Sequence, residues 1–215
     1  KKEYRKDYGI WVDIVSDLID REREKDNRPV VLLGGSIGGM LAYHAACKND
    51  NVKGIIATCL ADSRTEEARD ALARNKLWSR LGFVFFRFFP SILNHVNIRA
   101  SWIAKMKHIT NDRAFSKVFI RDPLVGRSKM NLGFYRSMTE YNPLVEPEYF
   151  SKCPVLLVHG ENDMWTPYNI SKNFFDRIAG VKTCVLLEGA GHYPYEEPGF
   201  GQMKNAINEF MKAIR

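Results

Sequence analysis

The stretch VVLLGGSIGGM, residues 30 to 40, runs from apolar residues into a serine flanked by glycines. Val30 to Leu33 make a short apolar run, which is typical of a strand buried on both faces of a parallel sheet. After Gly38, small residues recur at intervals that would let a helix lie close against that sheet. The glycines around Ser36 therefore predict a sharp turn from strand to helix. Such a turn either packs small residues or presents the serine for chemistry.

Gly34, Ser36 and Gly38 have the G-x-S-x-G spacing of a nucleophile elbow, in which a strained serine is lifted clear of the sheet. We expect side chains two residues to either side of the serine to collide, so glycines are needed at both positions. Ser36 would also lie at a helix N-terminus, where the backbone N–H of Ile37 points at developing negative charge. A glycine-rich turn without a nucleophile has the same spacing, so the assignment depends on finding a base and an acid.

Serine is a weak nucleophile unless a base takes its proton and a carboxylate orients that base. The segments HGENDMWTP (159–167) and EGAGHYPYEEP (188–198) both follow apolar, strand-like runs. Because parallel strands end at one edge of a sheet, we expect Asp163 and His192 to meet Ser36 at that edge. Asp62 and Glu161 are the alternative candidates for the acid. The alternative candidates for the base are histidines of a kind that is more often structural: His44, His95, His108 and His159, of which His159 is expected to point into the fold.

Strands alternate with helices at both ends of the chain, and the middle lacks buried strands. Thr166 and Pro167 fit the N-cap and first turn of a helix that would end at Gly180. Between about residues 62 and 148 the sequence predicts a helical insertion dense in aromatics, with Pro90 breaking one helix. The other expected elements are a helix over 9–26, strands over 53–59, 153–160 and 183–189, and an amphipathic helix from Phe200 onward.

Three segments of the chain resemble the serine-nucleophile branch of the α/β-hydrolase superfamily: GGSIGGM (34–40), HGENDMWTP and GAGHYPYEEP (189–198). Within that branch, the chain is similar to the monoacylglycerol lipase, lysophospholipase and serine aminopeptidase-like group. The resemblance implies an α/β-hydrolase fold, with a mostly parallel sheet flanked by helices and a variable helical cap. The core would comprise residues 1–60 and 151–215, and the cap would comprise residues 61–150.

The same resemblance implies more strands ahead of the nucleophile strand than this sequence offers. Nothing before Pro29 has the pattern of a strand, so we expect the chain to cover only the C-terminal half of the usual core. A missing N-terminal core segment, on the same or a separate polypeptide, would then cover the open sheet edge. It would also supply the second oxyanion donor, because only the Ile37 N–H can be assigned within this chain.

The resemblance implies a serine hydrolase that cleaves a carboxylic ester through an acyl-enzyme intermediate and needs no cofactor. Ser36 would be the nucleophile, His192 the base and Asp163 the acid. A medium or long acyl ester, such as a monoacylglycerol or lysophospholipid, suits the aromatic insertion. The residues expected to contact it are Trp165, Phe85 and Phe89. The alternatives are a peptidase, a thioesterase or an acyltransferase of the same fold, and a non-catalytic binding protein.

Charge and composition narrow the partners of the chain. Residues 61–150 hold 15 Lys and Arg against 9 Asp and Glu, so they carry +6 of the formal net charge of +7. A basic, aromatic segment suits a solvated face, an anionic substrate or contact with a membrane surface. The sequence contains no transmembrane run, no Cys/His spacing for a metal and no nucleic-acid motif. Its four cysteines form no C-x-x-C pair, which favours buried thiols and a reducing, cytoplasmic location.

Overall fold

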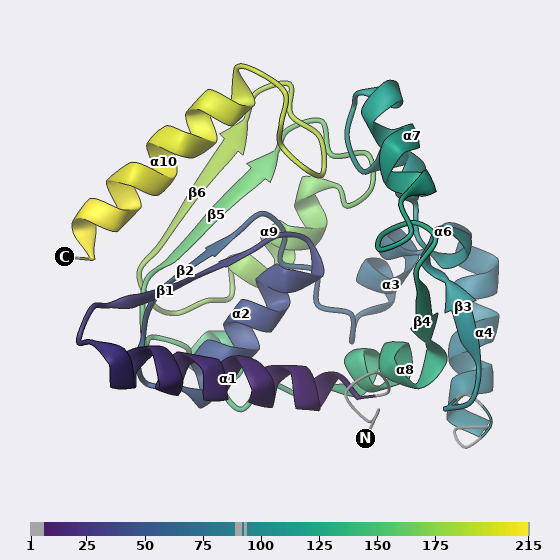
Figure 1. The fold of residues 1–215 in the computed structure, drawn as a ribbon, viewed down its shortest axis with the longest axis horizontal. Helices are drawn as coiled ribbons and strands as arrows, with labels where there is room; N and C mark the ends of the chain where they lie inside the picture. Colours follow the sequence, from purple (N-terminus) through teal and green to yellow (C-terminus); the bar gives the residue numbers. More distant parts are fainter. Residues whose placement is uncertain (1–6, 89–91, 93, 215) are drawn as a thin grey trace.

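The computed structural model describes residues 7–88, 92 and 94–214. Its centre is a four-stranded parallel sheet in the order β1-β2-β5-β6 (Figure 1). The strands are β1 (Val30–Gly34), β2 (Val52–Ala57), β5 (Val155–Gly160) and β6 (Lys182–Leu187). These are the four strands that the sequence predicts, and their parallel pairing confirms the expected α/β architecture.

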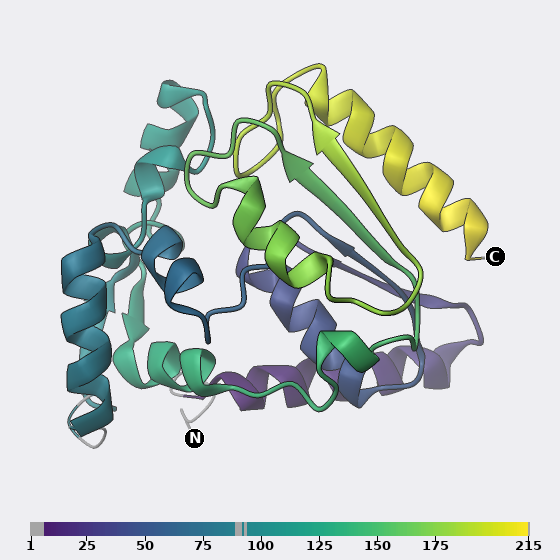
Figure 2. The same cartoon turned by 180° about the vertical axis from the view of Figure 1, so that it is seen from behind.

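Helices cover both faces of this sheet. One face packs against α2 (Ile37–Lys48) and α9 (Tyr168–Phe175), and α1 (Tyr8–Lys25) lies against α2 (Figures 1 and 2). The other face packs against α10 (Gly199–Ala213). Successive side chains of β5 pack into the hydrophobic clusters on opposite faces of the sheet: Leu157 faces α2 and α9, whereas Leu156 and Val158 face α10. Burial on both faces explains why the strands are continuous apolar runs.

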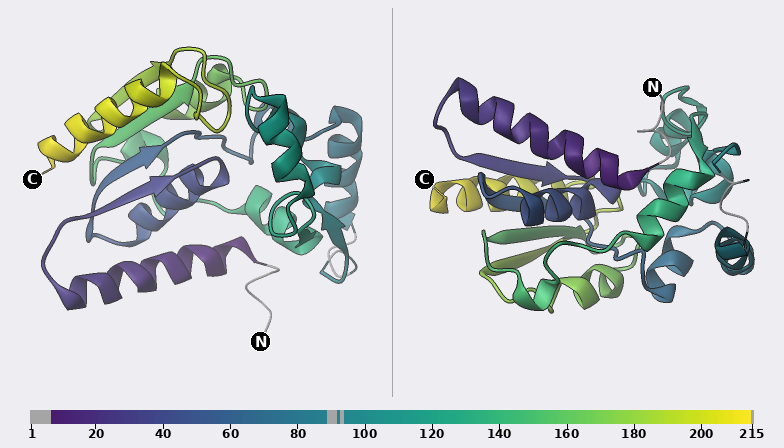
Figure 3. Two further views of the ribbon diagram at one scale, coloured as in Figure 1. Left: turned by 45° about the horizontal axis from the view of Figure 1, so that its top comes forward. Right: turned by 90° about the horizontal axis from the view of Figure 1, so that it is seen from below.

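A mostly helical segment connects β2 to β5 and lies beside the sheet (Figures 1 and 3). Its two short strands pair only with each other, antiparallel, and are mostly exposed or half-buried, so they are no part of the buried sheet. Pro90, the expected helix breaker, lies outside the described residues. The elements are α3 (Glu66–Leu72), α4 (Lys76–Phe88), β3 (Asn97–Arg99), α6 (Ala100–Ile103), η2 (Met106–His108), α7 (Arg113–Arg121), β4 (Lys129–Asn131), α8 (Leu132–Glu140) and η3 (Pro147–Tyr149).

The start of α9 differs from the sequence prediction. Pro167, not Thr166, is the N-cap residue, and the helix ends at Phe175 rather than near Gly180. Among the described residues, the enclosed Thr166 Oγ1 has no hydrogen-bond partner and so caps no N–H group of the helix. The Thr166 backbone N–H instead donates to Asp163 Oδ1 at 2.8 Å. Asp163 therefore orders the loop before α9, and no side chain caps the start of the helix within the described residues.

The cysteines of the chain occur as thiols, as the sequence predicts. All four cysteines are free, and Cys47, Cys59 and Cys153 are buried. Burial raises the pKa of each of these three thiols to about 11, so they are inert, protonated core residues at neutral pH. Within the described residues, no helix combines the length and the apolar character needed to cross a bilayer.

Candidate active site

The turn between β1 and α2 holds Ser36 in an unusual backbone conformation. Its φ is 52° and its ψ is −123°, and it is the only non-glycine residue with a positive φ in the described part of the chain. Such a conformation stores on the order of 1–3 kcal/mol of strain. The Ser36 N–H donates to Thr58 Oγ1 at 3.1 Å, which ties the turn to the end of β2. The strain has a structural effect: it presents the serine hydroxyl at the carboxyl edge of the sheet.

Two glycines make this turn possible, and one of them is not the glycine that the spacing predicts. A Cβ atom on Gly34 would lie 2.1 Å from the carbonyl oxygen of Gly38, as expected for the residue two before the serine. A Cβ on Gly38, however, would meet nothing within 4 Å beyond its own helix turn. The second collision is at Gly39, where a Cβ would lie 2.0 Å from the carbonyl oxygen of Cys59. Gly39 is needed because α2 crosses the end of β2 at close range.

Ser36, His192 and Asp163 form one continuous hydrogen-bonded chain. The Ser36 hydroxyl lies 2.7 Å from His192 Nε2, and His192 Nδ1 lies 2.7 Å from Asp163 Oδ2. The His192 and Asp163 side chains are almost fully buried, whereas Ser36 is partly accessible. With a carboxylate fixing a proton on Nδ1, Nε2 is an acceptor, so the serine hydroxyl donates to it. The three groups therefore have the geometry of a nucleophile, a base and an orienting acid.

Backbone groups fix the second oxygen of Asp163. Asp163 Oδ1 accepts hydrogen bonds from the N–H groups of Trp165 and Thr166, both at 2.8 Å. Only Oδ2 is left to face His192, so the carboxylate cannot rotate without losing two buried hydrogen bonds. The Trp165 ring also packs on the His192 ring, with centroids 4.7 Å apart. These contacts hold the imidazole in one orientation.

A cavity of about 780 Å³ opens beside this chain of residues. Ser36, Trp165 and Tyr193 line it from the sheet edge, and Leu72, Trp102 and Met106 line it from the segment between β2 and β5. Trp165 also donates from Nε1 to the carbonyl oxygen of Leu72, at 3.2 Å, and so connects the two sides of the cavity. A partly accessible serine at the wall of a large, mostly apolar cavity is the arrangement of a small-molecule site.

A model of the family described as "Serine aminopeptidase, S33" matches residues 3–199. The chain belongs to this α/β-hydrolase family. No curated protein matches the sequence. The family assignment agrees with the sequence resemblance, which rested on the same three segments around Ser36, Asp163 and His192.

Solved structures of the same fold include lipases and an esterase. The monoacylglycerol lipase of Paleococcus ferrophilus has a TM-score of 0.68 and 23% identity, over 95% of this chain and 76% of that one. A soluble variant of monoglyceride lipase from Saccharomyces cerevisiae has a TM-score of 0.71 and 16% identity, over 96% of this chain and 68% of that one. Est1E from Butyrivibrio proteoclasticus has a TM-score of 0.62 and 19% identity, over 95% of this chain and 69% of that one. Identities this low show a shared fold. The expectation that this chain covers only the C-terminal half of the core stays a prediction.

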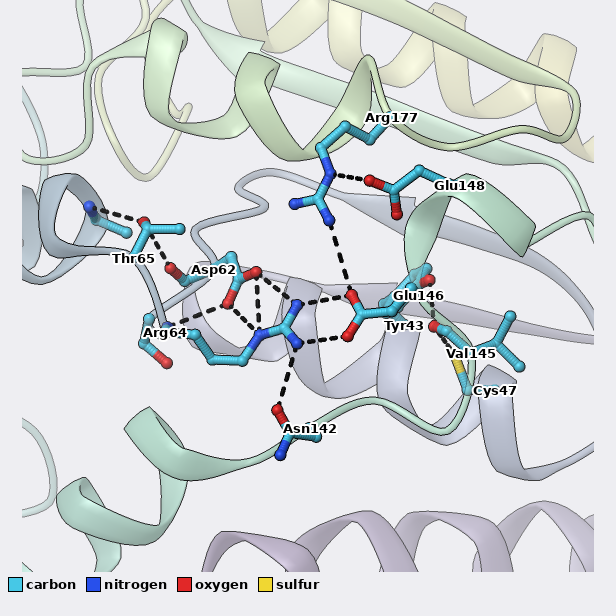
Figure 4. Close-up of polar contacts among 12 residues, drawn as sticks. Tyr43, Cys47, Asp62, Arg64, Thr65, Asn142, Val145, Glu146, Glu148 and Arg177 are labelled. Carbon is cyan, nitrogen blue, oxygen red and sulfur yellow. Dashed lines mark hydrogen bonds and ion pairs between the residues drawn. The ribbon is translucent and has the colours of Figure 1, made fainter.

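The alternative carboxylates of this family member are engaged elsewhere. Asp62 lies 2.8 Å from Arg64, which also lies 2.6 Å from Glu146 (Figure 4). The Arg64 guanidinium holds the pKa of Glu146 below its usual value. This network ties the loop after β2 to the segment that leads into β5. Glu161, the third candidate, accepts a hydrogen bond from the backbone of Gly189 at 3.3 Å.

The remaining histidines separate into three environments. His159 is fully buried, its Nδ1 faces the Gly160 carbonyl oxygen at 3.0 Å, and burial lowers its pKa, as expected for a histidine that points into the fold. His95 and His108 are not among the described residues that line the cavity. His44, which the sequence treats as structural, does line it. The spacing of Ile37, Met40 and His44 along α2 could have shown that these residues share one helix face.

The three residues expected to contact a substrate do not all lie at the cavity. Trp165 lines the cavity, whereas Phe85 is 44% exposed and does not. Phe89 lies outside the described residues. The periodicity of α4 identifies an apolar face but cannot tell whether that face covers the cavity or the outside of the molecule. No cluster of metal-ligating side chains occurs among the described residues.

Proposed function

We propose that this chain is a serine hydrolase that cleaves the carboxylic ester of a medium or long acyl chain through an acyl-enzyme intermediate. The observation that carries the proposal is the unbroken hydrogen-bonded chain from Asp163 through His192 to Ser36, at the wall of a 780 Å³ cavity. Monoacylglycerols and lysophospholipids are the substrate class that this cavity suits. Membership of a family whose structural neighbours are lipases and esterases is consistent with it.

In this mechanism Ser36 Oγ attacks the ester carbonyl carbon while its proton passes to His192 Nε2. Asp163 stabilises the imidazolium and keeps it oriented. As the tetrahedral intermediate collapses, His192 gives the proton to the leaving alcohol, and the acyl group remains on Ser36. A water then attacks the acyl-enzyme, loses its proton to His192, and releases the carboxylic acid as the proton returns to Ser36.

The oxyanion of both tetrahedral intermediates needs N–H donors. Ile37 is the first residue of α2, so its backbone N–H has no acceptor within the helix and is free to serve. The helix N-terminus adds a favourable partial positive charge there. We assign one donor to Ile37, and the second donor stays a prediction for a segment outside this chain.

The proposed substrate class can be tested with a series of 4-nitrophenyl esters from acetate to palmitate. Because an acyl chain buries apolar area in the cavity, we expect kcat/KM to rise several-fold per two carbons up to medium length. An aminoacyl 4-nitroanilide is the control for a peptidase, and an acyl thioester for a thioesterase. A flat profile would contradict the acyl cavity. Hydrolysis of the anilide or the thioester alone would contradict the ester class.

We also propose that residues 61–150 form a cap over the core of residues 1–60 and 151–215, and that α4 rests on an anionic lipid surface. Leu77, Leu81, Val84 and Phe88 recur at helical spacing and are all more than half exposed. The segment carries the +6 charge excess, which attracts anionic lipid head groups. An apolar helix face above an acyl cavity would place that cavity close to lipid esters.

Replacing Leu81 by aspartate is therefore expected to weaken binding to vesicles of phosphatidylcholine and phosphatidylglycerol by about tenfold, because one exposed leucine no longer enters the interface. Co-sedimentation measures the partition, and hydrolysis of a short soluble ester should be unchanged. Leu144→Asp is the matched control, since Leu144 is also more than half exposed but lies outside α4. Equal binding of wild type and Leu81→Asp would contradict the lipid surface.

A further inference from the structure

His44 is a buried histidine in the cavity wall that the proposed reaction does not use. It is only 6% exposed, and it lies on α2 between two aromatic rings. The Tyr8 hydroxyl lies 2.9 Å from His44 Nδ1, and the Tyr141 ring lies 4.7 Å from the imidazole ring between centroids. Tyr8 itself is 1% exposed. Neighbouring groups therefore fix both the position and the plane of the imidazole.

The second ring nitrogen of His44 faces the cavity. Within the described part of the chain, the hydrogen bond of its side chain uses Nδ1, and Nε2 is not one of the enclosed polar atoms that lack a partner. Two other polar groups in the wall are already engaged: Ser63 Oγ donates to the Met138 carbonyl oxygen and Asp62 pairs with Arg64. Nε2 of His44 is a polar atom that the protein has left available.

The protonation of His44 follows from its surroundings. Burial lowers the pKa of His44 to about 4, so the ring is neutral at neutral pH and offers no charge to an anion. A phenol hydroxyl is a better donor than acceptor, so Tyr8 donates to Nδ1 and the remaining proton lies on Nε2. His44 thus presents one N–H donor to the cavity.

The position of His44 on α2 gives an estimate of how far its N–H donor lies from the oxyanion donor at Ile37. His44 lies seven positions after Ile37, the assigned oxyanion donor. The backbone of α2 rises by about 10 Å between these two residues. Ile37, Met40 and His44 all line the cavity, so the path between the two donors runs along one wall. An extended chain covers that distance in about eight bonds.

We propose that the substrate carries a second oxygen, as a hydroxyl or carbonyl group about eight bonds from the scissile carbonyl, and that His44 Nε2–H donates to it while Tyr8 positions His44. The proposal rests on the proposed ester hydrolysis and names the substrate class more closely, as an oxygenated medium-chain ester. A plain alkyl chain at this point would leave a buried N–H without a partner, which costs free energy.

Two matched pairs of esters test the proposal and distinguish the acyl side from the alcohol side. The acyl pair is 4-nitrophenyl 9-hydroxynonanoate and 4-nitrophenyl decanoate, which differ only in a hydroxyl for a terminal methyl. The alcohol pair is the octanoate monoester of heptane-1,7-diol and the octanoate of octan-1-ol, which place the hydroxyl at the same number of bonds from the scissile carbonyl as in the acyl pair. For one pair, we expect the ratio of kcat/KM, hydroxylated over plain, to fall about tenfold in both His44→Leu and Tyr8→Phe.

Tyr43→Phe is the matched control. Tyr43 packs against the same imidazole, with centroids 5.9 Å apart, but its hydroxyl donates to the Val145 carbonyl oxygen and it does not line the cavity. In Tyr43→Phe, the ratio of kcat/KM for the hydroxylated over the plain ester should equal that of wild type. Ratios in His44→Leu that equal those of wild type for both pairs would overturn the proposal, and this holds even if Tyr8→Phe does not fold.

Binding of the same esters to Ser36→Ala, measured by calorimetry, separates this inference from the proposed function. Tighter binding of one hydroxylated ester, lost in Ser36→Ala/His44→Leu, supports the role of His44 whether or not wild type turns the ester over. Hydrolysis by wild type together with equal binding of both members of each pair overturns the inference and leaves the proposed function intact.

Discussion

Replacing Ser36 by alanine is expected to lower kcat/KM for the preferred ester by roughly five to six orders of magnitude, because His192 is left without a nucleophile to activate. Labelling by a fluorophosphonate probe should disappear in the same variant. Both measurements follow from the 2.7 Å contact between Ser36 Oγ and His192 Nε2. Labelling that survives in Ser36→Ala would contradict the assignment of the nucleophile.

The backbone of the elbow supplies a control for folding. Alanine at position 36 meets the same positive φ as serine, so its thermal unfolding should be close to that of wild type. Glycine has no such restriction, and Ser36→Gly should be more stable than Ser36→Ala by about 1–3 kcal/mol. Ser116→Ala, in a buried serine outside the cavity, should keep both activity and labelling.

The sequence predicts the central sheet and the meeting of Ser36, Asp163 and His192 because each depends on local pattern and chain order. A buried strand shows as a run of apolar residues, and parallel strands end at one edge wherever they occur in the chain. Three polar segments that follow three such strands must then lie near one another. Their mutual distances are a consequence of the topology.

Contacts between elements that are distant in sequence could not be predicted in this way. Gly39 is required by the carbonyl oxygen of Cys59, twenty residues later, and no spacing rule for the elbow contains that atom. Thr166 has the pattern of a helix cap, but its N–H serves Asp163 instead. The imidazole of His44 is held by the rings of Tyr8 and Tyr141, which come from other parts of the chain, although helix periodicity alone could have placed His44 on the same face as Ile37. In each case the deciding neighbour belongs to another element.

Replacing Asp163 by asparagine is expected to lower kcat by about four orders of magnitude with little change in KM. The two N–H groups of Trp165 and Thr166 need an oxygen at the place of Oδ1, so the asparagine carbonyl must occupy it. The amide NH2 group then faces His192 Nδ1 and forces that nitrogen to accept. The imidazole proton moves to Nε2, where it blocks transfer from Ser36. The measurement is a steady-state comparison of the purified variants on one ester.

Glu161→Gln is the control for this substitution, because it makes the same chemical change on the same loop, at a carboxylate that accepts a hydrogen bond from the Gly189 backbone rather than facing His192. Its kcat should stay close to that of wild type. Asp62→Asn tests the remaining candidate acid and should act mainly on stability, since Asp62 is paired with Arg64. A wild-type rate in Asp163→Asn combined with loss of activity in Asp62→Asn would move the acid to the end of β2. The fixed position of Asp163 Oδ1 argues against that outcome, because it turns Oδ2 toward His192 at 2.7 Å, whereas His159 Nε2 lies 3.8 Å from the same oxygen, beyond hydrogen-bond distance.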